Sequence, residues 1–168
     1  MIGQEKVYET LKALGIEFDY LEHPEAPTIE IARQYWKNLD STHCKNLFFR
    51  NHKGNRHYLV IFHCDRNLAI HDLEQLLKQG KLSFASEKRM EKYLGLKPGS
   101  VSPFGLVNDT EHHVYVFLDE NLKQARKLSF HPNDNRASLA IKTEDFIRYM
   151  DQTGNCLLYT SPSPRDPK

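Results

Sequence analysis

Three short segments of the sequence carry groups that could act on a carbonyl compound or hold a phosphate. Lys45 begins the apolar run KNLFF beside Asn46, so its ammonium either reaches solvent from a strand end or points into a cleft. The segment GSVSP, residues 99–103, could present backbone N–H groups to a carbonyl or an oxyanion, although an ordinary Pro/Gly connection has the same composition. His131, in FHPNDN, either reaches a cleft from a strand end or has a structural role.

A basic segment surrounds Lys45. Between Ser41 and Cys64 there is no acidic residue, whereas the segment holds four cations and four histidines. The four cations are Lys45, Arg50, Lys53 and Arg56. A solvated hairpin edge protected by charge would have this composition. So would a surface that faces the phosphates of a nucleic acid, because Lys and Arg position nucleic acid through its backbone.

Two His-Cys pairs suggest a different chemistry. His43-Cys44 and His63-Cys64 could serve a metal or thiol enzyme, but no third ligand follows at a recognisable spacing. Cysteine beside a buried strand usually packs as a small hydrophobe. The sequence also lacks GxGxxG, GxxxxGKS/T and HExxH, the motifs of dinucleotide, P-loop and zincin sites. We therefore expect neither a metal nor a cofactor.

The elements that must position these residues belong to one globular domain. The chain has 168 residues, 39% of them hydrophobic, with 23 Lys and Arg against 22 Asp and Glu. This balance excludes the global basic field that drives non-specific nucleic-acid binding, so any such contact needs a local patch. There is no apolar run of membrane-spanning length and no secretory apolar block at the start, which favours a cytoplasmic protein. Three cysteines without CxxC spacing argue against a disulfide framework.

Hydrophobic periodicity and capping residues predict mixed helices and strands. Helices are expected at 4–14, from Thr28 to about 36, at 72–79, 86–95 and 143–152, with Thr143 capping the last. Strands are expected at 18–21, 45–51, 56–64, 82–85, 113–119, 126–130 and 136–141. Hairpins outnumber βαβ crossovers. The predicted fold is therefore a single α+β domain on a mixed, largely antiparallel sheet.

The last segment differs from the rest of the chain. Residues 156–166, CLLYTSPSPRD, are rich in Pro and Ser and show no turn or strand pattern of their own. Read as codons in one frame, these eleven residues match a widely used transposase-based sequencing adapter. We therefore expect residues 156–168 to be a translated, non-native tail. The natural domain would then span 1–155, with 21 basic and 21 acidic residues and two cysteines.

Several segments taken together resemble a known family. EHPEAPT, CKNLFFRN, HYLVIF, LSFAS, LGLKPGSVSPFGLVND, VYVFLD and FHPNDNRASLAI follow the order of the YbaK-type editing domains associated with prolyl-tRNA synthetase. The likeness covers residues 4–152 and is greatest to the freestanding ProX-type branch, which hydrolyses alanine wrongly attached to tRNA(Pro). It implies an α+β domain with a barrel-like mixed sheet flanked by helices. It also implies a monomeric, metal-free aminoacyl-ester hydrolase.

The resemblance also assigns roles by position. Lys45 corresponds to the family's essential lysine, held near the terminal adenosine and its phosphate, and Gly99 with Pro103 frames a GxxxP loop whose backbone holds the substrate carbonyl. The implied catalytic residues are Lys45, Gly99 and His131. The implied substrate-binding residues are Thr28, Asn46, Ser100, Val101, Ser102, Pro103 and Phe104. The residues expected to contact the tRNA backbone are Arg50, Lys53 and Arg56. The sequence departs from many members at Ser102, where they have Thr, and at His43-Cys44.

An aminoacyl ester is already activated, so such a site needs only to orient the carbonyl, stabilise its developing negative charge and admit a water. A small pocket would act as a second sieve that admits alanine and excludes proline. The expected partners are the acceptor end of tRNA(Pro) and prolyl-tRNA synthetase, with no DNA and no membrane. Three alternatives stay open. They are removal of cysteine or another small amino acid, a non-catalytic module that binds tRNA or a synthetase, and a metal or thiol enzyme using His43, Cys44, His63 and Cys64.

Overall fold

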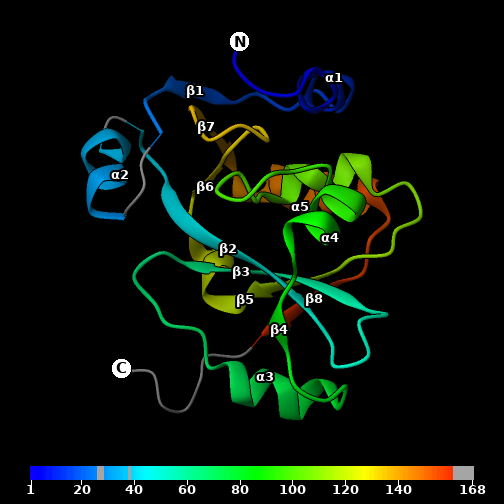
Figure 1. The fold of residues 1–168 in the computed structure, drawn as a ribbon. Helices are drawn as coiled ribbons and strands as arrows, with labels where there is room; N and C mark the ends of the chain where they lie inside the picture. The colour runs from blue at the N-terminus through cyan, green and yellow to red at the C-terminus, as the bar shows by residue number, and fades with distance from the viewer. Residues whose placement is uncertain (26–28, 38, 161–168) are drawn as a thin grey trace.

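A computed structural model describes residues 1–25, 29–37 and 39–160 (Figure 1). The α-helices in these ranges are α1 (Glu5–Ala13), α2 (Ile29–Trp36), α3 (Ile70–Leu77), α4 (Glu87–Leu94) and α5 (Thr143–Thr153). Two 3-10 helices, η1 (Pro103–Asn108) and η2 (Glu120–Gln124), lie in connections. No helix within these ranges is long and apolar enough to cross a membrane.

Eight strands of the described residues form one mixed sheet. They are β1 (Asp19–Glu22), β2 (Thr42–Arg50), β3 (His57–His63), β4 (Ser83–Phe84), β5 (Tyr115–Asp119), β6 (Lys127–Phe130), β7 (Ala137–Lys142) and β8 (Leu157–Thr160). Their hydrogen-bonded order is β1-β7-β6-β2-β3-β5-β8, and β4 pairs with β2 beside this path. The pairs β2–β6, β3–β5 and β5–β8 are parallel, and the others are antiparallel. The mixed, largely antiparallel α+β fold predicted from the sequence is confirmed.

Strand β2 lies in the middle of this path and is paired unequally on its two sides. Toward β3 it forms a continuous antiparallel ladder from Cys44 to Arg50. Toward β6 the parallel pairing covers only Thr42↔Leu128 and His43↔Ser129. Further along the same edge, β4 pairs with Phe49 and Arg50. Residues 44–47 of β2 therefore have no strand partner on the β6 side among the described residues.

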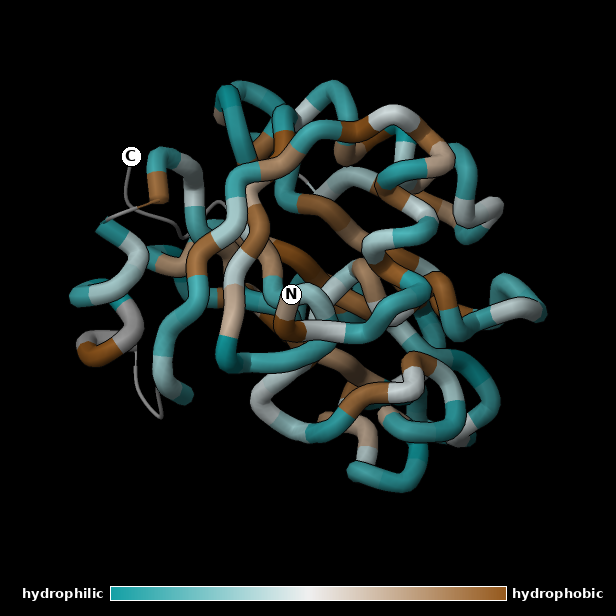
Figure 2. Tube along the Cα trace, turned by 90° about the horizontal axis from the view of Figure 1, so that it is seen from above, coloured by the Kyte–Doolittle hydropathy of each residue, from teal (hydrophilic) through white to brown (hydrophobic). Residues whose placement is uncertain are grey.

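Because side chains alternate along β2, the strand contributes residues to two hydrophobic clusters on opposite faces of the sheet. Phe48 belongs to the main cluster, to which α1, α4 and α5 contribute, whereas Phe49 belongs to a smaller cluster that includes Leu73 of α3. Strand β3 is buried on both faces from His57 to Phe62. Figure 2 shows hydrophobic stretches running through the inside of the trace, with hydrophilic turns around them. A slip of one residue would exchange the two faces, so this pattern fixes the register.

The start of the last helix differs from the sequence-based expectation. Thr143 does not cap α5, because Lys142 is the N-cap residue and no side-chain cap forms. Thr143 instead donates its hydroxyl hydrogen to the carbonyl oxygen of Ala125 at 2.5 Å. A hydroxyl at the start of a helix can accept a hydrogen bond from an unpaired backbone N–H of the first turn, or donate one to a nearby carbonyl oxygen. In this protein Thr143 donates to the carbonyl of a different element. The bond ties α5 to the end of η2.

The tail segment also has structure that its sequence pattern did not predict. Leu157–Thr160 form β8, an edge strand that pairs in parallel with β5 from Val116↔Leu157 to Asp119↔Thr160. The expectation that this segment lacks a strand was wrong. A strand edge offers N–H and C=O groups to any extended apolar chain, and LLYT supplies one. Because the pairing needs only backbone groups, the adapter origin of residues 156–168 stays a prediction.

A buried histidine joins the β2–β3 hairpin to α4. His57 begins β3 with no exposed surface, and its Nε2 accepts a hydrogen bond from Nη1 of Arg89 at 3.0 Å. Its Nδ1 lies 2.9 Å from Nε2 of His113, and the ring of Tyr93 packs 4.2 Å away between centroids. Burial, with smaller contributions from His113 and Arg89, lowers the pKa of His57 to about 4. The folded protein therefore holds His57 neutral.

We predict that the free energy of unfolding falls as the pH drops from about 6.5 toward 4. Over this range the unfolded chain binds a proton at His57 that the folded chain excludes, because the pKa is lowered on folding. Urea denaturation between about pH 7.5 and 5 measures the dependence. His57→Gln, which stays polar but cannot titrate, should reduce the slope by up to about 1.4 kcal/mol per pH unit. An unchanged slope in this variant would mean that His57 is not the titrating group.

Candidate active site

A small cavity opens where the pairing of β2 with β6 ends. Its volume is about 20 Å³, which is room for about one water molecule or one small chemical group. Residues of β2, β6 and β7 contribute to its wall, as does the end of α2. The cavity is lined by Trp36, His43, Cys44, Asn46, Ser129, Phe130, His131 and Ser138. The unpaired stretch of β2 is thus the structural origin of the cavity.

His131 forms part of the wall and is held in one tautomer. Its Nδ1 lies 2.8 Å from the carbonyl oxygen of Ala137, and because a carbonyl only accepts, Nδ1 carries the hydrogen. The neutral ring then has Nε2 as an acceptor. Burial lowers the pKa of His131, which keeps the ring neutral at pH 7. The register of β6 with β7, in which Phe130 faces Leu139, places His131 beside Ser138.

Ser138 is oriented by a second buried histidine. Nδ1 of His23 lies 3.0 Å from the carbonyl oxygen of Pro24 and so carries the hydrogen. Nε2 of His23 is therefore the acceptor for the Ser138 hydroxyl at 2.8 Å. The His23 ring lies 5.9 Å from that of His131 and stacks on Tyr35. Ser138 directs its hydrogen toward His23, which leaves its lone pairs for the cavity.

Trp36 and His43 close one side of the cavity. Their rings stack with centroids 4.4 Å apart, and Nδ1 of His43 lies 2.5 Å from Oγ of Ser129. Burial is the main cause that lowers the pKa of His43 to about 4. Burial also raises the pKa of the Cys44 thiol. The cavity is therefore polar, but its titratable lining groups are neutral at pH 7.

Lys45 and Asn46 point to opposite sides of β2, as neighbours on a strand do. The side chain of Asn46 lines the cavity, and its Oδ1 is buried without a hydrogen-bond partner among the described residues. The ammonium of Lys45 donates to the carbonyl oxygen of Arg66 at 3.5 Å and lies 5.8 Å from the ring centroid of Phe62. No described carboxylate forms an ion pair with Lys45. The structure thus joins Asn46 to His131 and leaves Lys45 at the strand beside the cavity.

The loop of residues 99–104 packs against the turn that follows His131. The amide of Asn133 donates to the carbonyl oxygen of Phe104 at 3.2 Å, and the hydroxyl of Tyr149 donates to that of Pro103 at 2.8 Å. Ser102 uses its Oγ to accept the N–H of Phe104 at 3.1 Å. The side chains of Ser102, Pro103 and Phe104 are fully or almost fully buried. These three therefore anchor the loop and do not line the cavity.

The backbone of the same loop keeps donors available. The N–H of Ser100 donates to the carbonyl oxygen of Lys97 at 3.1 Å. No described group accepts a hydrogen bond from the N–H of Gly99, Val101 or Ser102. Gly99 has a φ of +87°, a conformation that favours glycine. The loop thus offers fixed N–H groups of the kind expected from the sequence.

The predicted tRNA-backbone residues lie at the other end of the hairpin. Arg50 ends β2, about 13 Å along the strand from Asn46. Arg89 of α4 joins this end, where its Nη1 donates to the carbonyl oxygen of Gly54 at 2.7 Å. The structure therefore does not bring Arg50, Lys53 and Arg56 to the cavity. Thr28, the remaining predicted residue, lies outside the described residues.

The two His-Cys pairs do not converge on one site. The donor atoms of His63, Cys64 and Asp65 lie within 4.8 Å of one another. However, Asp65 forms an ion pair with Arg33, and its N–H donates to Nδ1 of His63 at 3.0 Å. His43 and Cys44 belong instead to the cavity wall. The arrangement favours structural roles for both pairs.

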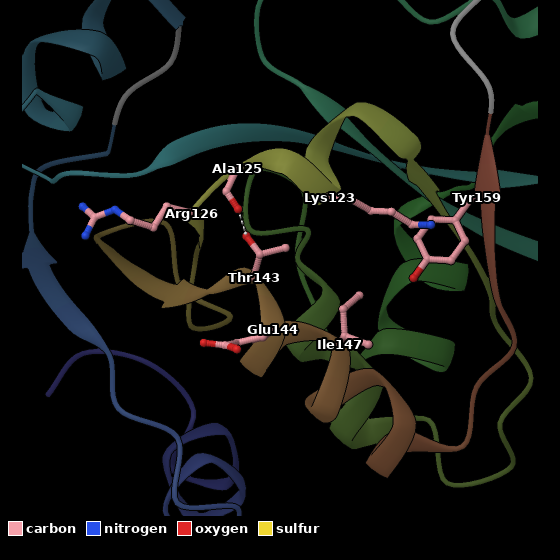
Figure 3. Close-up of a pocket in the computed structure, with 7 residues that line it drawn as sticks. All are labelled: Lys123, Ala125, Arg126, Thr143, Glu144, Ile147 and Tyr159. Carbon is pink, nitrogen blue, oxygen red and sulfur yellow. Dashed lines mark hydrogen bonds between the residues drawn. The ribbon is translucent and has the colours of Figure 1, made fainter.

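A larger pocket of about 380 Å³ lies elsewhere, between η2, α5 and β8 (Figure 3). Its wall contains Tyr159, whose ring centroid is 3.7 Å from the ammonium of Lys123. Figure 3 shows the bond from Thr143 to Ala125 at one side of this pocket. None of the sequence-predicted site residues lines it. Because Tyr159 belongs to the segment expected to be non-native, we assign this pocket no function.

The sequence analysis did not identify Ser129 of β6 and Ser138 of β7, which line the cavity, or His23 after β1, which bonds to Ser138. Ser129 and Ser138 are polar residues in otherwise apolar strands, LSF and ASLAI. A polar side chain at such a position was the available signal, since burial demands a hydrogen-bond partner. His23 is part of the EHPEAPT segment, but its pairing with Ser138 joins residues 115 positions apart. No local pattern reveals that contact.

Comparison with known proteins identifies the class of protein. A family model described as the aminoacyl-tRNA editing domain matches residues 23–149. The prolyl-tRNA editing protein ProX of Acetoanaerobium sticklandii is 38% identical over 156 residues, which cover 92% of this chain and 94% of that protein. Prolyl-tRNA synthetase associated domain-containing protein 1 of Danio rerio is 33% identical over 152 residues, with coverage of 89% and 82%. A solved structure of a candidate trans-editing enzyme for prolyl-tRNA synthetase matches with a TM-score of 0.70 at 21% identity, covering 94% and 96%.

The fold and the cavity therefore define an editing domain, and the chain belongs to the aminoacyl-tRNA editing domain family. It is an enzyme of the hydrolase class that acts on the ester bond of aminoacyl-tRNA. The family resemblance predicted from the sequence segments is confirmed.

We predict that hydrolysis of aminoacyl-tRNA needs neither a metal nor a cysteine thiol. The double variant Cys44→Ala, Cys64→Ala should keep most of the wild-type rate, because burial raises the pKa of both thiols and leaves them un-ionised at pH 7. EDTA should have no effect on the wild-type protein. Lys45→Ala serves as the control that loses activity. A rate that collapses with EDTA, or in the double variant while its urea midpoint is unchanged, would restore the metal or thiol alternative.

Proposed function

We propose that the protein removes alanine from mischarged Ala-tRNA(Pro) in trans, releasing alanine and free tRNA(Pro). The observation that carries the proposal is the uncharged polar cavity of about 20 Å³, whose lining residue Asn46 directly follows Lys45 in β2. The named relatives, a prolyl-tRNA editing protein and a protein with a prolyl-tRNA synthetase associated domain, support tRNA(Pro) as the carrier.

The chemistry needs no protein nucleophile. A water attacks the ester carbonyl, the bond from the carbonyl carbon to the ribose oxygen breaks, and that oxygen takes up a proton. The N–H groups of Gly99 and its neighbours stabilise the charge that develops on the carbonyl oxygen, where fixed donors are most effective. A hydroxyl of the tRNA's own ribose assists the water. His131 limits the space around the amino acid.

Lys45 fixes the end of the tRNA. Among the described residues its ammonium has one hydrogen-bond acceptor, a carbonyl at 3.5 Å, so a phosphate can replace a weak contact at low cost. The flexible stem of lysine can turn from Phe62 toward the ligand. Lys45 and Asn46 are adjacent in sequence, so one short piece of β2 holds the phosphate and the aminoacyl group together. This positioning supplies much of the catalysis.

The size of the cavity supports alanine over proline. A space for about one small group suits the methyl group of alanine better than the five-membered ring of proline. Cysteine and serine exceed alanine by a single heavy atom, and removal of either is the alternative reaction of the same site. A binding module that retains tRNA without turnover is the alternative of a different class.

Further partners follow from the charge pattern. The turn with Arg50, Lys53 and Arg56 is the proposed contact for the tRNA backbone, and Arg89 adds a guanidinium to the same end of the hairpin. Prolyl-tRNA synthetase is a proposed second partner. We further propose that the protein acts as a cytoplasmic monomer.

We predict that, among tRNA(Pro) charged with alanine, cysteine, serine or proline, the alanyl ester is hydrolysed fastest. The prolyl ester should decay at its spontaneous rate, because its ring does not enter the cavity. Release of each labelled amino acid over time measures this order. Faster release of cysteine than of alanine would favour the alternative substrate, and tRNA binding without any release would favour the module.

We predict that Lys45→Ala lowers kcat/KM for Ala-tRNA(Pro) by roughly tenfold or more, because it removes a charge-assisted contact to phosphate. Lys45→Arg should recover part of the loss, since it restores the positive charge. Lys12→Ala, at an exposed position of α1 outside the cavity lining, is the matched control and should leave the rate unchanged. Deacylation by Lys45→Ala at the wild-type rate would refute this role.

A further inference from the structure

Two guanidinium groups from different elements meet at the turn of the β2–β3 hairpin, far from the cavity. Arg50 comes from the end of β2 and Arg89 from α4, and both side chains reach Gly54. From the position that a Cβ of residue 54 would occupy, Nη1 of Arg50 lies 3.0 Å away and Nη2 of Arg89 lies 2.9 Å away. Gly54 has a φ of +74° and no side chain, so it leaves room for both groups.

Arg89 is held in place by two acceptors. Its Nη1 donates to the carbonyl oxygen of Gly54 at 2.7 Å and to Nε2 of the buried His57 at 3.0 Å. Both hydrogens of Nη1 are thereby used, whereas no described group accepts a hydrogen bond from Nη2 or Nε. A guanidinium edge of this kind donates two parallel hydrogen bonds to a phosphate or carboxylate. Arg89 is therefore fixed by the protein while one bidentate edge stays available.

The pair of arginines lacks a counter-charge. Neither Arg50 nor Arg89 forms an ion pair with a described carboxylate, and both residues are partly exposed. Besides burial, which is the main cause, the charges of both arginines and of Lys92 help to lower the pKa of His57. Like charges at short distance repel one another, so the arrangement becomes favourable when an anion lies between them. The pair thus fits an anionic ligand that reaches it from solvent.

We propose that Arg50 and Arg89 form a clamp for one phosphate group, and that this group is a phosphodiester of the tRNA acceptor end. The identity of the ligand rests on the proposed deacylase function, to which the clamp adds a defined phosphate site. Two planar forks that approach from different elements can bind separate oxygens of one phosphate. Arg50 lies about 13 Å along β2 from Asn46, so the clamped phosphate belongs to a nucleotide that precedes the terminal adenosine.

The clamp differs from a general attraction between a basic turn and tRNA. The three atoms nearest to the Cβ position of residue 54 all belong to Arg50 and Arg89. Arg56 points elsewhere, because its Cζ lies 5.9 Å from the ring centroid of Tyr115. A diffuse basic surface would lose similar affinity with each cation removed. A clamp loses most of it with either of two residues.

Binding of uncharged tRNA(Pro) at several salt concentrations separates these cases. We expect Arg50→Ala to weaken binding by roughly tenfold and to reduce the slope of log K against log salt concentration by about one. Lys88→Ala, which removes an exposed charge next to Arg89 on α4, is the matched control and should have only a slight effect. Equal losses in the two variants would overturn the clamp.

Arg89→Lys tests the geometry of the contact. This variant keeps the positive charge but loses the planar fork, so we expect weaker tRNA binding with a nearly unchanged salt slope. Wild-type affinity in Arg89→Lys would contradict the bidentate contact. Because Arg89 also bonds to protein groups, urea midpoints check that its variant is folded. Arg50 makes no side-chain hydrogen bond to a described group, so Arg50→Ala gives a reading that does not depend on such bonds.

A short substrate locates the clamped phosphate. The alanyl ester of the dinucleotide CpA ends in the same adenosine but lacks the earlier nucleotides. Arg50→Ala should lower kcat/KM by roughly tenfold on Ala-tRNA(Pro) and leave the rate on this short ester unchanged. A loss of the same size on both substrates would mean that Arg50 acts on the aminoacyl end, and the clamp would be wrong.

Inorganic phosphate tests the other source of the same chemistry. If Arg50→Ala abolishes phosphate binding but leaves the Kd of tRNA(Pro) unchanged, the site takes a small anion and the assignment to tRNA is wrong. Binding of uncharged tRNA involves no ester, so it reports on the clamp separately from turnover. A wild-type protein that binds tRNA through Arg50 but releases no alanine would refute the proposed function and support the clamp. Release of alanine with unchanged tRNA affinity in Arg50→Ala would refute the clamp alone.

Discussion

The parallel contact between β2 and β6 is only two residue pairs long, and the position of the candidate active site depends on where it stops. On its other side β2 is paired with β3 along a continuous antiparallel ladder, so the strand stays part of the sheet beside the gap. A longer contact would fill the gap with backbone hydrogen bonds. A missing contact would release His43 from Ser129. The cavity thus forms where the pairing of β2 with β6 is incomplete, and the pairing of β2 with β3 keeps the strand in place there.

Uncharged histidines give this cavity its chemical character. Burial makes the charged form of an imidazole costly, which holds His43 and His131 neutral at pH 7. Carbonyl oxygens of Ala137 and Pro24 then decide which ring nitrogen keeps its hydrogen. Backbone acceptors outside the cavity therefore determine the polarity inside it. The same atoms with the opposite tautomers would present donors, and the site would suit an anion.

The sequence predicts the elements better than it predicts the site. Periodicity and caps locate most helices and strands, and Ser86 caps α4 as expected, accepting from the N–H of Arg89. Alternation places Lys45 and Asn46 on opposite faces, but only the fold decides which face meets the cavity. Ser138 joins the site through the β6–β7 register, which depends on contacts between distant segments. The hydrogen bond of Thr143 and the pairing of β8 could not be predicted for the same reason. Each depends on a partner from a distant part of the sequence.

The strand β8 adds to the sheet at the edge farthest from β1, while the described cavity wall comes from residues 36–138. A chain made from its amino terminus can therefore complete the cavity before its last strand exists. During that interval β5 is an open edge, ready to pair with any extended segment nearby. If residues 156–168 are a non-native tail, as their sequence predicts, β8 covers an edge of β5 that the natural domain pairs in another way or leaves to solvent.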